Sequence, residues 1–340
     1  MIHFLKDAFR PVDESTMRRV YEKIRTPHKY GVVLSFPGEL CDCPAVFRYD
    51  GRWYMAFIRI SKDTASSGYD SHLAVSDDLI HWEYLYKTLG RDNLNNWDSR
   101  QIALYAAYIE NDLDGEYRIQ KVNGKYYFSC MGGNLDGYET DPLMMGQVKA
   151  DDPRIPQTYE KLPLPRLTPM DKDARKGETL TIYKSNLFID ESRTTGYRYV
   201  NAYNAKASDH KESIFLAVSE NGEDWMRLGD RPVIWDDTED KRIQINGDAQ
   251  IFKWGDIYVM LYFVLENGVT YDTFACSYDL VNWTKWTGER LIESSEPYDE
   301  VYAHKPCLII KDGIVYHFYC AVSGAGERTI ALATSEKIGS

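Results

Sequence analysis

Short apolar stretches of three to five residues alternate with polar turns along almost the whole chain, and only the N-terminal segment shows helical periodicity. In five places a Gly-x-x-Tyr element separates two neighbouring stretches. Asp-Gly and Asn-Gly pairs tolerate the positive φ of tight turns, so each element predicts a β-hairpin. The five copies begin at Gly51, Gly124, Gly196, Gly255 and Gly313.

A second pattern predicts the outer half of each unit. Ser76–Trp82, Ser219–Trp225 and Ser277–Trp283 each read as a serine, a polar turn and a tryptophan, and each follows a short apolar strand. A degenerate version lies around residues 144–149. Four strands in each of five units predict an all-β fold, a five-bladed β-propeller, more economically than a β-sandwich with accidental internal similarity.

The pattern also predicts how the ring begins and closes. Asp13 can cap a short helix that Pro27 stops, and Met17, Val20 and Ile24 would share its apolar face. We expect one domain over residues 1–340, with residues 1–30 as a short helical extension. Because the fifth unit ends before its outer strand, we expect the N-terminal segment to supply that strand. The inner strands are expected to start near Cys43, Tyr117, Ser185, Asp248 and Lys305.

Composition excludes several classes of partner. The net charge of −12 argues against binding to nucleic acid or an anionic membrane, and no apolar run approaches the length of a membrane span. The N-terminus lacks the pattern of a signal peptide, so we expect a cytoplasmic protein, or a periplasmic one if a leader has been removed. The six cysteines form no CxxC pair and are expected to be reduced and buried. The abundance of aromatic residues, 26 Tyr and 8 Trp, suits β-structure first and sugar stacking second.

The start of each inner strand is the first place to look for chemistry, because these starts open on one face of a propeller. When the units are aligned on the turn glycine, Asp42, Asn246 and His304 occupy one equivalent position. Asp248 lies two residues further and therefore on the same strand face. Tyr183 and Lys184 of the third unit are expected at about the same level.

The loop between the second and third strands should open on the same face. It contains 68–70 in the first unit, 137–139 in the second and 271–272 in the fourth, so carboxylates from different blades would converge. Two carboxyl groups, one ionised and one protonated, are the usual apparatus for hydrolysing an acetal. Each candidate also has a plainer interpretation. Asp42 and Asp248 could be strand-start turn residues, His304 a structural histidine or metal ligand, and Asp70 and Glu139 residues that stabilise their own loops.

Three short stretches resemble a known group of enzymes. They are Asp-x-Pro-Ala-Val-Phe at 42–47, Gly-Asp-Ala-Gln-Ile at 247–251, and Tyr302–Pro306 followed by Tyr316–Cys320. Together they resemble the five-bladed propeller glycosidases of the family 43-like superfamily. The arrangement is most similar to family 117, and family 130 is more distant. The resemblance extends from about Tyr30 to the end.

The resemblance implies a single-displacement, inverting mechanism. Asp42 would be the general base, Asp248 the second carboxylate that orients the sugar, and His304 the acid. Family 43 enzymes instead take the acid from a Glu-Gly-Pro motif in the third blade, which this chain lacks. Glu178 is the nearest acidic residue there, so the proton donor stays open between His304, Glu139 and Glu178.

The resulting hypothesis is an exo-acting glycosidase for a plant or algal oligosaccharide. Glycoside phosphorolysis, with phosphate held by residues such as Lys184, Lys305 and Arg242, and a non-catalytic carbohydrate-binding propeller are the alternatives. No cofactor is expected to be required, although the resemblance suggests a structural divalent cation, such as calcium, beneath His304 in the central channel. The oligomeric state is left open. The expected substrate contacts come from Asp70, Tyr138, Lys184, Gln250 and Lys305.

Overall fold

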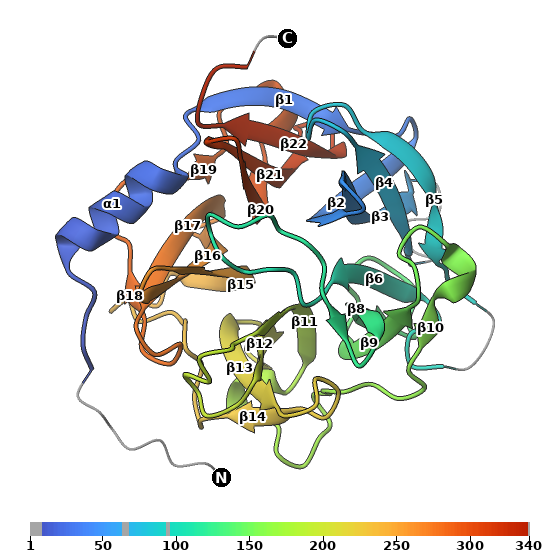
Figure 1. Cartoon of the computed structure of the whole chain (residues 1–340), viewed down its shortest axis with the longest axis horizontal. Coiled ribbons are helices and arrows are strands. Elements are labelled where there is room, and N and C mark those ends of the chain that lie inside the picture. Colours follow the sequence, from blue (N-terminus) through green and yellow to red (C-terminus); the bar gives the residue numbers. More distant parts are fainter. Residues whose placement is uncertain (1–8, 63–67, 93–95, 339–340) are drawn as a thin grey trace.

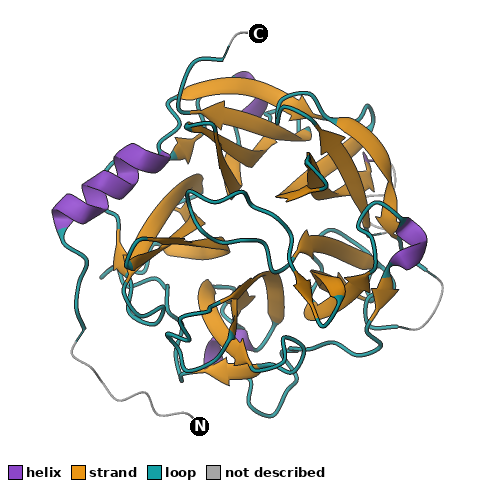
Figure 2. Cartoon of the chain, in the orientation of Figure 1, coloured by secondary structure: helices purple, strands orange, loops and turns teal. Residues whose placement is uncertain are grey.

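Five antiparallel sheets, the blades, are arranged around a central channel (Figures 1 and 2). This computed structural model describes residues 9–62, 68–92 and 96–338. Each blade is a meander whose first strand is innermost, because each hairpin places the next strand further from the axis. The prediction of an all-β, five-bladed propeller with an N-terminal helix is confirmed.

Blades one, three and four each contain their strands in simple chain order. Blade four also pairs the short β19 (Ile292–Glu293) with β17. The other strands, from inner to outer, are β2 (Glu39–Tyr49), β3 (Arg52–Ser61), β4 (Asp70–Ser76) and β5 (Glu83–Leu89) in blade one; β11 (Thr181–Ile189), β12 (Tyr199–Lys206), β13 (Glu212–Ser219) and β14 (Met226–Leu228) in blade three; and β15 (Ile243–Trp254), β16 (Ile257–Glu266), β17 (Val269–Ser277) and β18 (Thr284–Lys285) in blade four.

Blade two departs from the predicted pattern. Its order is β6 (Gln101–Ala106), β8 (Lys125–Gly133), β9 (Met144–Ala150) and β10 (Glu160–Lys161), and β7 (Lys121–Val122) is only a short partner of β8. The expected inner-strand start near Tyr117 is therefore wrong. The hairpin at Gly124 joins β7 to β8, and the true inner strand lies before a long excursion of the chain.

That excursion, residues 107–120, crosses the end of the channel at which the inner strands finish (Figure 1). The carbonyl of Tyr117 accepts from the amide of Arg48 at 2.8 Å, and the Tyr117 hydroxyl accepts from the amide of Ile310 at 3.0 Å. The amide of Lys253 donates to the carbonyl of Asn111 at 2.7 Å. The segment is thus tied to blades one, four and five at the end of the channel near the hairpin turns.

Blade five is closed by the N-terminal segment, as predicted. Strand β1 (His28–Leu34) pairs with β22 (Arg328–Thr334), outside β21 (Ile314–Val322) and β20 (Tyr302–Lys311). The preceding helix α1 (Glu14–Ile24) begins at Asp13, whose carboxylate accepts from the amide of Thr16. Its apolar face packs on the outside of the ring, and Tyr21 stacks on Trp286 of blade four.

The serine and tryptophan pattern marks the turn between third and fourth strands. The Ser76 hydroxyl accepts from the amide of Leu79 at 2.9 Å, and the indole of Trp82 donates to the carbonyl of Leu79. The same two contacts recur among Ser277, Leu280 and Trp283. Short 3-10 turns among the described residues include η2 (Pro156–Thr158), η3 (Lys176–Glu178) and η4 (Pro297–Asp299).

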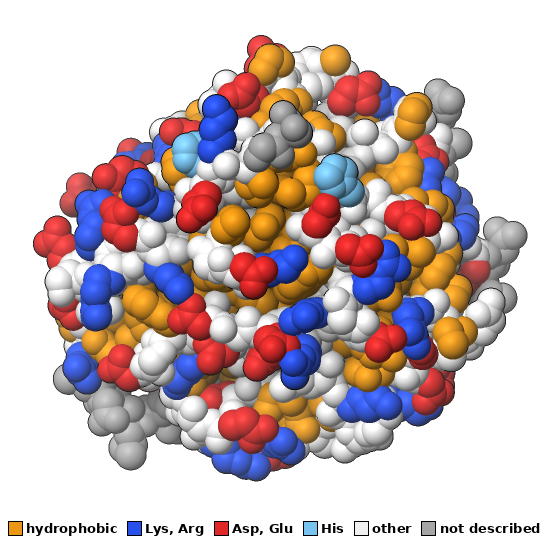
Figure 3. All heavy atoms as spheres, turned by 45° about the horizontal axis from the view of Figure 1, so that its top comes forward, with side chains coloured by type: hydrophobic (Ala, Val, Ile, Leu, Met, Phe, Trp, Pro, Cys, Tyr) orange, Lys and Arg blue, Asp and Glu red, His pale blue; other side chains and the backbone are white. Residues whose placement is uncertain are grey.

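The cysteines, the surface charges and the helices each bear on what the composition predicts. All six cysteines are buried and free, as predicted. Acidic and basic side chains are interspersed over the face shown in Figure 3, without a field of one sign. Within the described part of the sequence, no helix is both long and apolar enough to span a bilayer.

Candidate active site

Bulges near the starts of four inner strands turn side chains toward the open end of the channel. The strand register shifts after Asp42 in β2, Ile182 in β11, Gly247 in β15 and His304 in β20. Three of these bulges contain a residue with positive φ: Cys43 at 60°, Asp248 at 53° and Lys305 at 64°. Bulges commonly re-aim side chains beside active sites.

The bulges correct the predicted alignment of blade four. In the first and fifth hairpins the glycine is the second turn residue, whereas Gly255 is the first, because Trp254 pairs with Ile257. Gly247, rather than Asn246, therefore matches Asp42 and His304. Asp248 consequently occupies the same bulge position as Cys43 and Lys305.

A cavity of about 170 Å³ lies at this end of the channel. Its polar lining residues come mainly from blades two, three and five, and its aliphatic ones from blade four. Of the residues predicted to form the site, Tyr138, Glu139, Asp248, His304 and Lys305 line it. Tyr183, which was expected at about the same level, lines it too, and the remaining lining residues are Asn204, Glu212, Ile245, Phe263, Leu265, Thr270, Tyr302 and Arg328.

Asp42 lies beneath the cavity and not in its lining, with 1% of its surface exposed. Its Oδ2 accepts from the Tyr138 hydroxyl, from Lys305 Nζ at 3.0 Å and from an Arg328 guanidinium nitrogen at 2.8 Å. Its Oδ1 accepts from the amide of Cys43 at 2.7 Å. Burial by itself would raise the pKa of Asp42, but Lys305 and Arg328 hold that pKa well below its usual range. These contacts favour an anchoring role over the predicted role as general base.

Lys305 lies inside a group of possible metal ligands. Among the described residues, the donor atoms of Asp42, Cys43 and Glu139 form the one metal-like cluster, within 4.8 Å of one another. The Lys305 ammonium donates to Asp42, to Glu139 at 2.8 Å and to the Tyr138 hydroxyl at 3.1 Å. A protein cation thus lies where a metal would be held. His304 is not part of this cluster, and the predicted cation beneath it stays a prediction.

Asp248 lines the cavity, and part of its carboxyl group is free to accept further hydrogen bonds. Its Oδ2 is buried without a hydrogen-bond partner in the described structure, and Lys184 Nζ lies 3.9 Å away. Burial raises the pKa of Asp248 although the neighbouring Lys184 and Lys305 act in the opposite direction. Lys184 does not line the cavity but supports one of its walls.

His304 is held as a neutral ring. Burial, together with the charge of Lys305, lowers the pKa of His304 to about 3. Its Nδ1 lies 3.2 Å from the carbonyl of Cys320, which can only accept, so the ring proton is on Nδ1. The other nitrogen is then an acceptor. His304 is consequently a poor candidate for the proton donor.

Glu212, on the first residue of β13, is a cavity carboxyl group that the sequence analysis missed. Burial and, next, the charge of Glu139 raise the pKa of Glu212 to about 8. The carboxyl Oε2 lies 2.8 Å from the Asn204 amide nitrogen, which fixes its direction. A glutamic acid that stays protonated at neutral pH is suited to proton donation.

Arg328, the first residue of β22, is a second lining residue that the sequence analysis missed. The described hydrogen bonds of its guanidinium, to Asp42, Tyr138 and Cys320, all involve one terminal nitrogen. Both missed residues follow the loop between second and third strands, in blades three and five. The rule that pointed to 68–70, 137–139 and 271–272 would have found them if it had been applied to all five blades.

Two predicted substrate contacts lie elsewhere. Asp70 faces a separate hollow of about 230 Å³, where it pairs with Arg91 at 3.2 Å and Lys87 at 3.6 Å. Gln250 bridges blades four and five, because its amide group both accepts from the amide of Leu308 at 2.7 Å and donates to the carbonyl of Leu308 at 3.3 Å. Neither residue lines the cavity.

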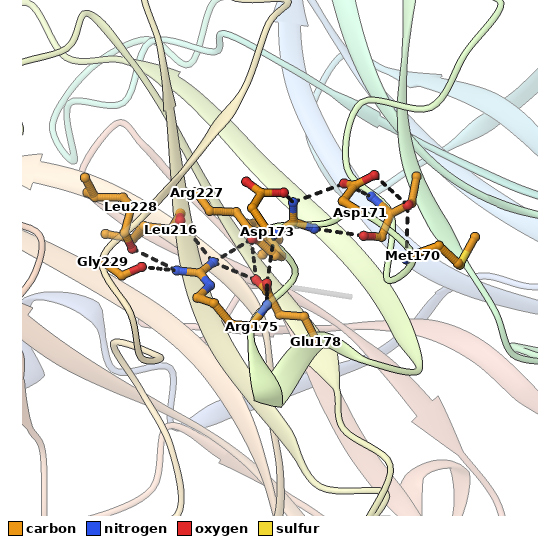
Figure 4. A network of polar contacts seen from close by, with 11 residues as sticks. Met170, Asp171, Asp173, Arg175, Glu178, Leu216, Arg227, Leu228 and Gly229 are labelled. Atoms are coloured by element: carbon orange, nitrogen blue, oxygen red, sulfur yellow. Dashed lines mark hydrogen bonds and ion pairs between the residues drawn. The ribbon is translucent and has the colours of Figure 1, made fainter. Parts of the chain in front are cut away.

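Glu178 belongs to another buried network in blade three (Figure 4). Its carboxylate accepts from Arg175 at 2.6 Å, from Arg227 at 2.8 Å and from the Tyr203 hydroxyl at 2.5 Å. Arg227 continues the network to Asp171. The Glu178 carboxylate is thus bound by side chains of the same region, and Glu178 does not line the cavity. These contacts favour a structural role over the predicted catalytic one.

Comparison with solved structures identifies the class of protein. One solved structure, described as a complex of BT0996 with RGII, is 36% identical over 96% of this sequence and 97% of its own, with a TM-score of 0.90. Another, described as "Glycoside hydrolase", has the same identity and coverage and a TM-score of 0.91. The fold is thus that of a propeller glycosidase. This protein belongs to the family of these two structures and is a glycoside hydrolase.

More distant structures share the fold alone. A thermostable family-43 glycoside hydrolase is 16% identical over 89% of this sequence and 95% of its own, and a family 117 glycoside hydrolase from Zobellia galactanivorans is 14% identical over 92% and 91%. Both have a TM-score of 0.62, so the fold is no more similar to that of the family 117 enzyme than to that of the family-43 enzyme. The resemblance to five-bladed propeller glycoside hydrolases is confirmed. No family model and no curated protein matches the sequence.

Proposed function

We propose that this glycoside hydrolase removes a terminal sugar from a plant or algal oligosaccharide by an inverting displacement. Glu212 is the proton donor, and Glu139 is the carboxylate that activates water. The observation that carries the proposal is that two glutamates with different neighbours line one small cavity. Glu212 is buried as the neutral acid, while Glu139 lies against the Lys305 ammonium.

The roles follow from these surroundings. A neutral carboxyl group can protonate the departing glycosidic oxygen, which is the step that an alcohol leaving group requires. Glu139 accepts from the Lys305 ammonium at 2.8 Å, and as a carboxylate it would take a proton from water on the other side of the sugar. The negative charge of Glu139 also raises the pKa of Glu212, because like charges close together disfavour a second charge.

Asp42 supports this pair from below. Its negative charge holds Lys305, Arg328 and the Tyr138 hydroxyl at the floor of the cavity. Asp248 and Arg328 are then available to hydrogen-bond the sugar. Arg328 is the more versatile of the two, because the remaining N–H groups of its planar guanidinium can bind two neighbouring hydroxyls.

The size and charge of the cavity support action on a single neutral terminal sugar. Its volume of about 170 Å³ is below the roughly 300–1,000 Å³ of pockets for drug-sized ligands. Its cations Lys305 and Arg328 are already balanced by the carboxylates of Asp42 and Glu139. The similar structure described as a complex with RGII supports an oligosaccharide of that origin as the first substrate to examine.

The charge balance also favours hydrolysis over phosphorolysis. A phosphate site needs cations without protein counter-charges. Lys305 is paired with Asp42 and Glu139, Lys184 lies beside Asp248, and Arg242 pairs with Glu266 outside the cavity. We therefore expect no requirement for phosphate or for a cofactor.

The test is a set of rates and one product analysis. With aryl glycosides and RGII-derived oligosaccharides, each with and without phosphate, Glu212→Gln should reduce kcat by ~10² or more when the leaving group is a sugar alcohol, and by much less when it is dinitrophenol. Glu139→Gln should reduce both rates. NMR of the first-formed sugar should show the inverted anomer. Unchanged rates in both variants would refute the assignment, and a retained anomer would refute inversion alone.

A further inference from the structure

Gln101 is buried beneath the loop that contains Tyr138 and Glu139. It is the first residue of β6, the inner strand of blade two, and it is completely inaccessible to solvent. Its side-chain nitrogen donates to the carbonyl of Leu135 at 3.0 Å and to the carbonyl of Thr140 at 3.1 Å. Its side-chain oxygen accepts from the amide of Thr140 at 3.0 Å.

These three contacts close the loop at both of its ends. Leu135 precedes Tyr138 and Glu139, and Thr140 follows them directly. Glu139 has a φ of 53°, an uncommon conformation for a residue other than glycine, which local backbone preference alone does not favour. The loop is also held by the Thr140 hydroxyl, which donates to the carbonyl of Asp136 at 2.9 Å, by the partly exposed ion pair of Arg100 with Asp136, and by the cavity contacts of Tyr138 and Glu139. The Gln101 amide is fully buried and satisfies three backbone groups, so it restrains both ends of the loop from beneath.

The neighbouring backbone leaves space for this arrangement. A methyl group on Gly133, which pairs with Gln101 across the sheet, would lie 3.0 Å from the Gln101 amide nitrogen and 2.7 Å from Leu143. Glycine at this position thus lets the glutamine amide lie flat beneath the loop.

We propose that Gln101 is a positioning residue for the reaction: it holds the loop that places Glu139 against Lys305 and Tyr138 over Asp42. This inference rests on the proposed function of Glu139. Because a misplacement of about 1 Å can reduce the rate by ~10²-fold, loss of the three hydrogen bonds should act on the chemical step.

The experiment compares Gln101→Leu with Gln147→Leu. Gln147 is also a buried glutamine of blade two, but its amide donates at 2.8 Å to the carbonyl of Gly222, in a turn at the other end of the blades. Both variants should lower Tm by similar amounts. Gln101→Leu should lower kcat by at least ~10-fold and speed deuterium exchange of the Thr140 amide. Gln147→Leu should leave kcat within about twofold and the exchange of residues 134–141 unchanged.

A conservative variant and the exchange readout separate the possible failures. Burial should keep the carboxyl group of Gln101→Glu protonated, so this variant retains an acceptor and a donor and should recover much of the kcat. Unchanged exchange at Thr140 in Gln101→Leu, or equal loss of kcat in Gln147→Leu, would overturn the inference. If exchange increases as expected but Glu139→Gln has full activity, the positioning of the loop stands and the proposed role of Glu139 fails.

Discussion

Two buried carboxylates in this protein have almost the same set of partners and different surroundings. Asp42 contacts a lysine, an arginine and a tyrosine, and Glu178 contacts two arginines and a tyrosine. Both side chains are essentially inaccessible to solvent. The composition of a polar cluster therefore does not identify an active site.

The difference lies in where the partners come from and what they border. The partners of Asp42, namely Tyr138, Lys305 and Arg328, come from blades two and five, and all three line the cavity. The partners of Glu178 all belong to the region of blade three, and none of them lines the cavity. A cluster that joins several blades at the open end of the channel can respond to substrate, whereas one within a single blade stabilises that blade.

The largest contrast should appear when Asp42 is neutralised. Asp42→Asn removes the counter-charge of Arg328 and leaves Lys305 with Glu139 alone, which should cost about 3–5 kcal/mol of the free energy of unfolding. It should also reduce kcat/KM by ~10² or more, because three cavity groups lose their anchor. Denaturant unfolding and steady-state kinetics on one sample measure both. An active variant of normal stability would contradict the anchoring role.

Glu178→Gln should lower stability without lowering activity. Arg175 and Arg227 lose a buried counter-charge, so we expect a similar loss of about 3–5 kcal/mol. At a temperature where the variant is folded, kcat and KM should stay within about twofold of the wild-type values. A large fall in kcat with normal KM would return Glu178 to the catalytic candidates.

The pH dependence should distinguish the two buried glutamates of blade three. Burial opposes ionisation at both, yet Arg175 lowers the pKa of Glu178 whereas the pKa of Glu212 is raised to about 8. As the proton donor must be protonated, kcat/KM should fall about tenfold per pH unit above this value. This fall at high pH should be absent from the residual activity of Glu212→Gln. If the fall persisted unchanged in that variant, it would report the ionisation of another group.

The same shift predicts a change in stability. Between pH 4.5, the ordinary value, and about 8, folded Glu212 retains a proton that the unfolded chain releases. The free energy of unfolding should therefore fall as pH rises through this window, relative to Glu212→Gln. Unfolding curves at several pH values would show the difference between the two proteins.

The smallest expected effect compares two arginines. Arg328→Lys keeps the charge near Asp42 but removes the planar group that we propose binds the sugar, so KM should rise about tenfold with a modest change in Tm. Arg227→Lys should leave KM unchanged and lower Tm. If both substitutions raised KM equally, Arg328 would have no special part in recognition.

Several parts of the fold and site could be predicted from local pattern because local interactions determine them. Asp50-Gly51 and its counterparts form hairpin turns whatever surrounds them, and the Ser76 and Trp82 pattern forms a turn through contacts within seven residues. Five such units imply a ring, and a ring implies that strand starts converge. Tyr138, Glu139, Asp248, His304 and Lys305 were accordingly predicted in the site.

Other features could not be predicted in this way because they depend on distant segments. The inner strand of blade two is separated from its hairpin by the channel-crossing segment, and no local spacing reveals that. Asp42 and Arg328 are 286 positions apart in the chain, and only closure of the ring by β1 and β22 brings blade five against blade one. The anchoring role of Asp42 could not be inferred without this contact.

The sequence by itself determined the number of blades, the hairpins, the capped helix and the class of enzyme. The tertiary structure alone decided which carboxyl groups line the cavity and which neighbours surround each of them. Glu139, Glu178 and Glu212 are the same residue type, and they differ in burial and in the charges packed beside them. Protonation depends on desolvation and on neighbouring charges, and both are set by the packing of blades that are far apart in the sequence.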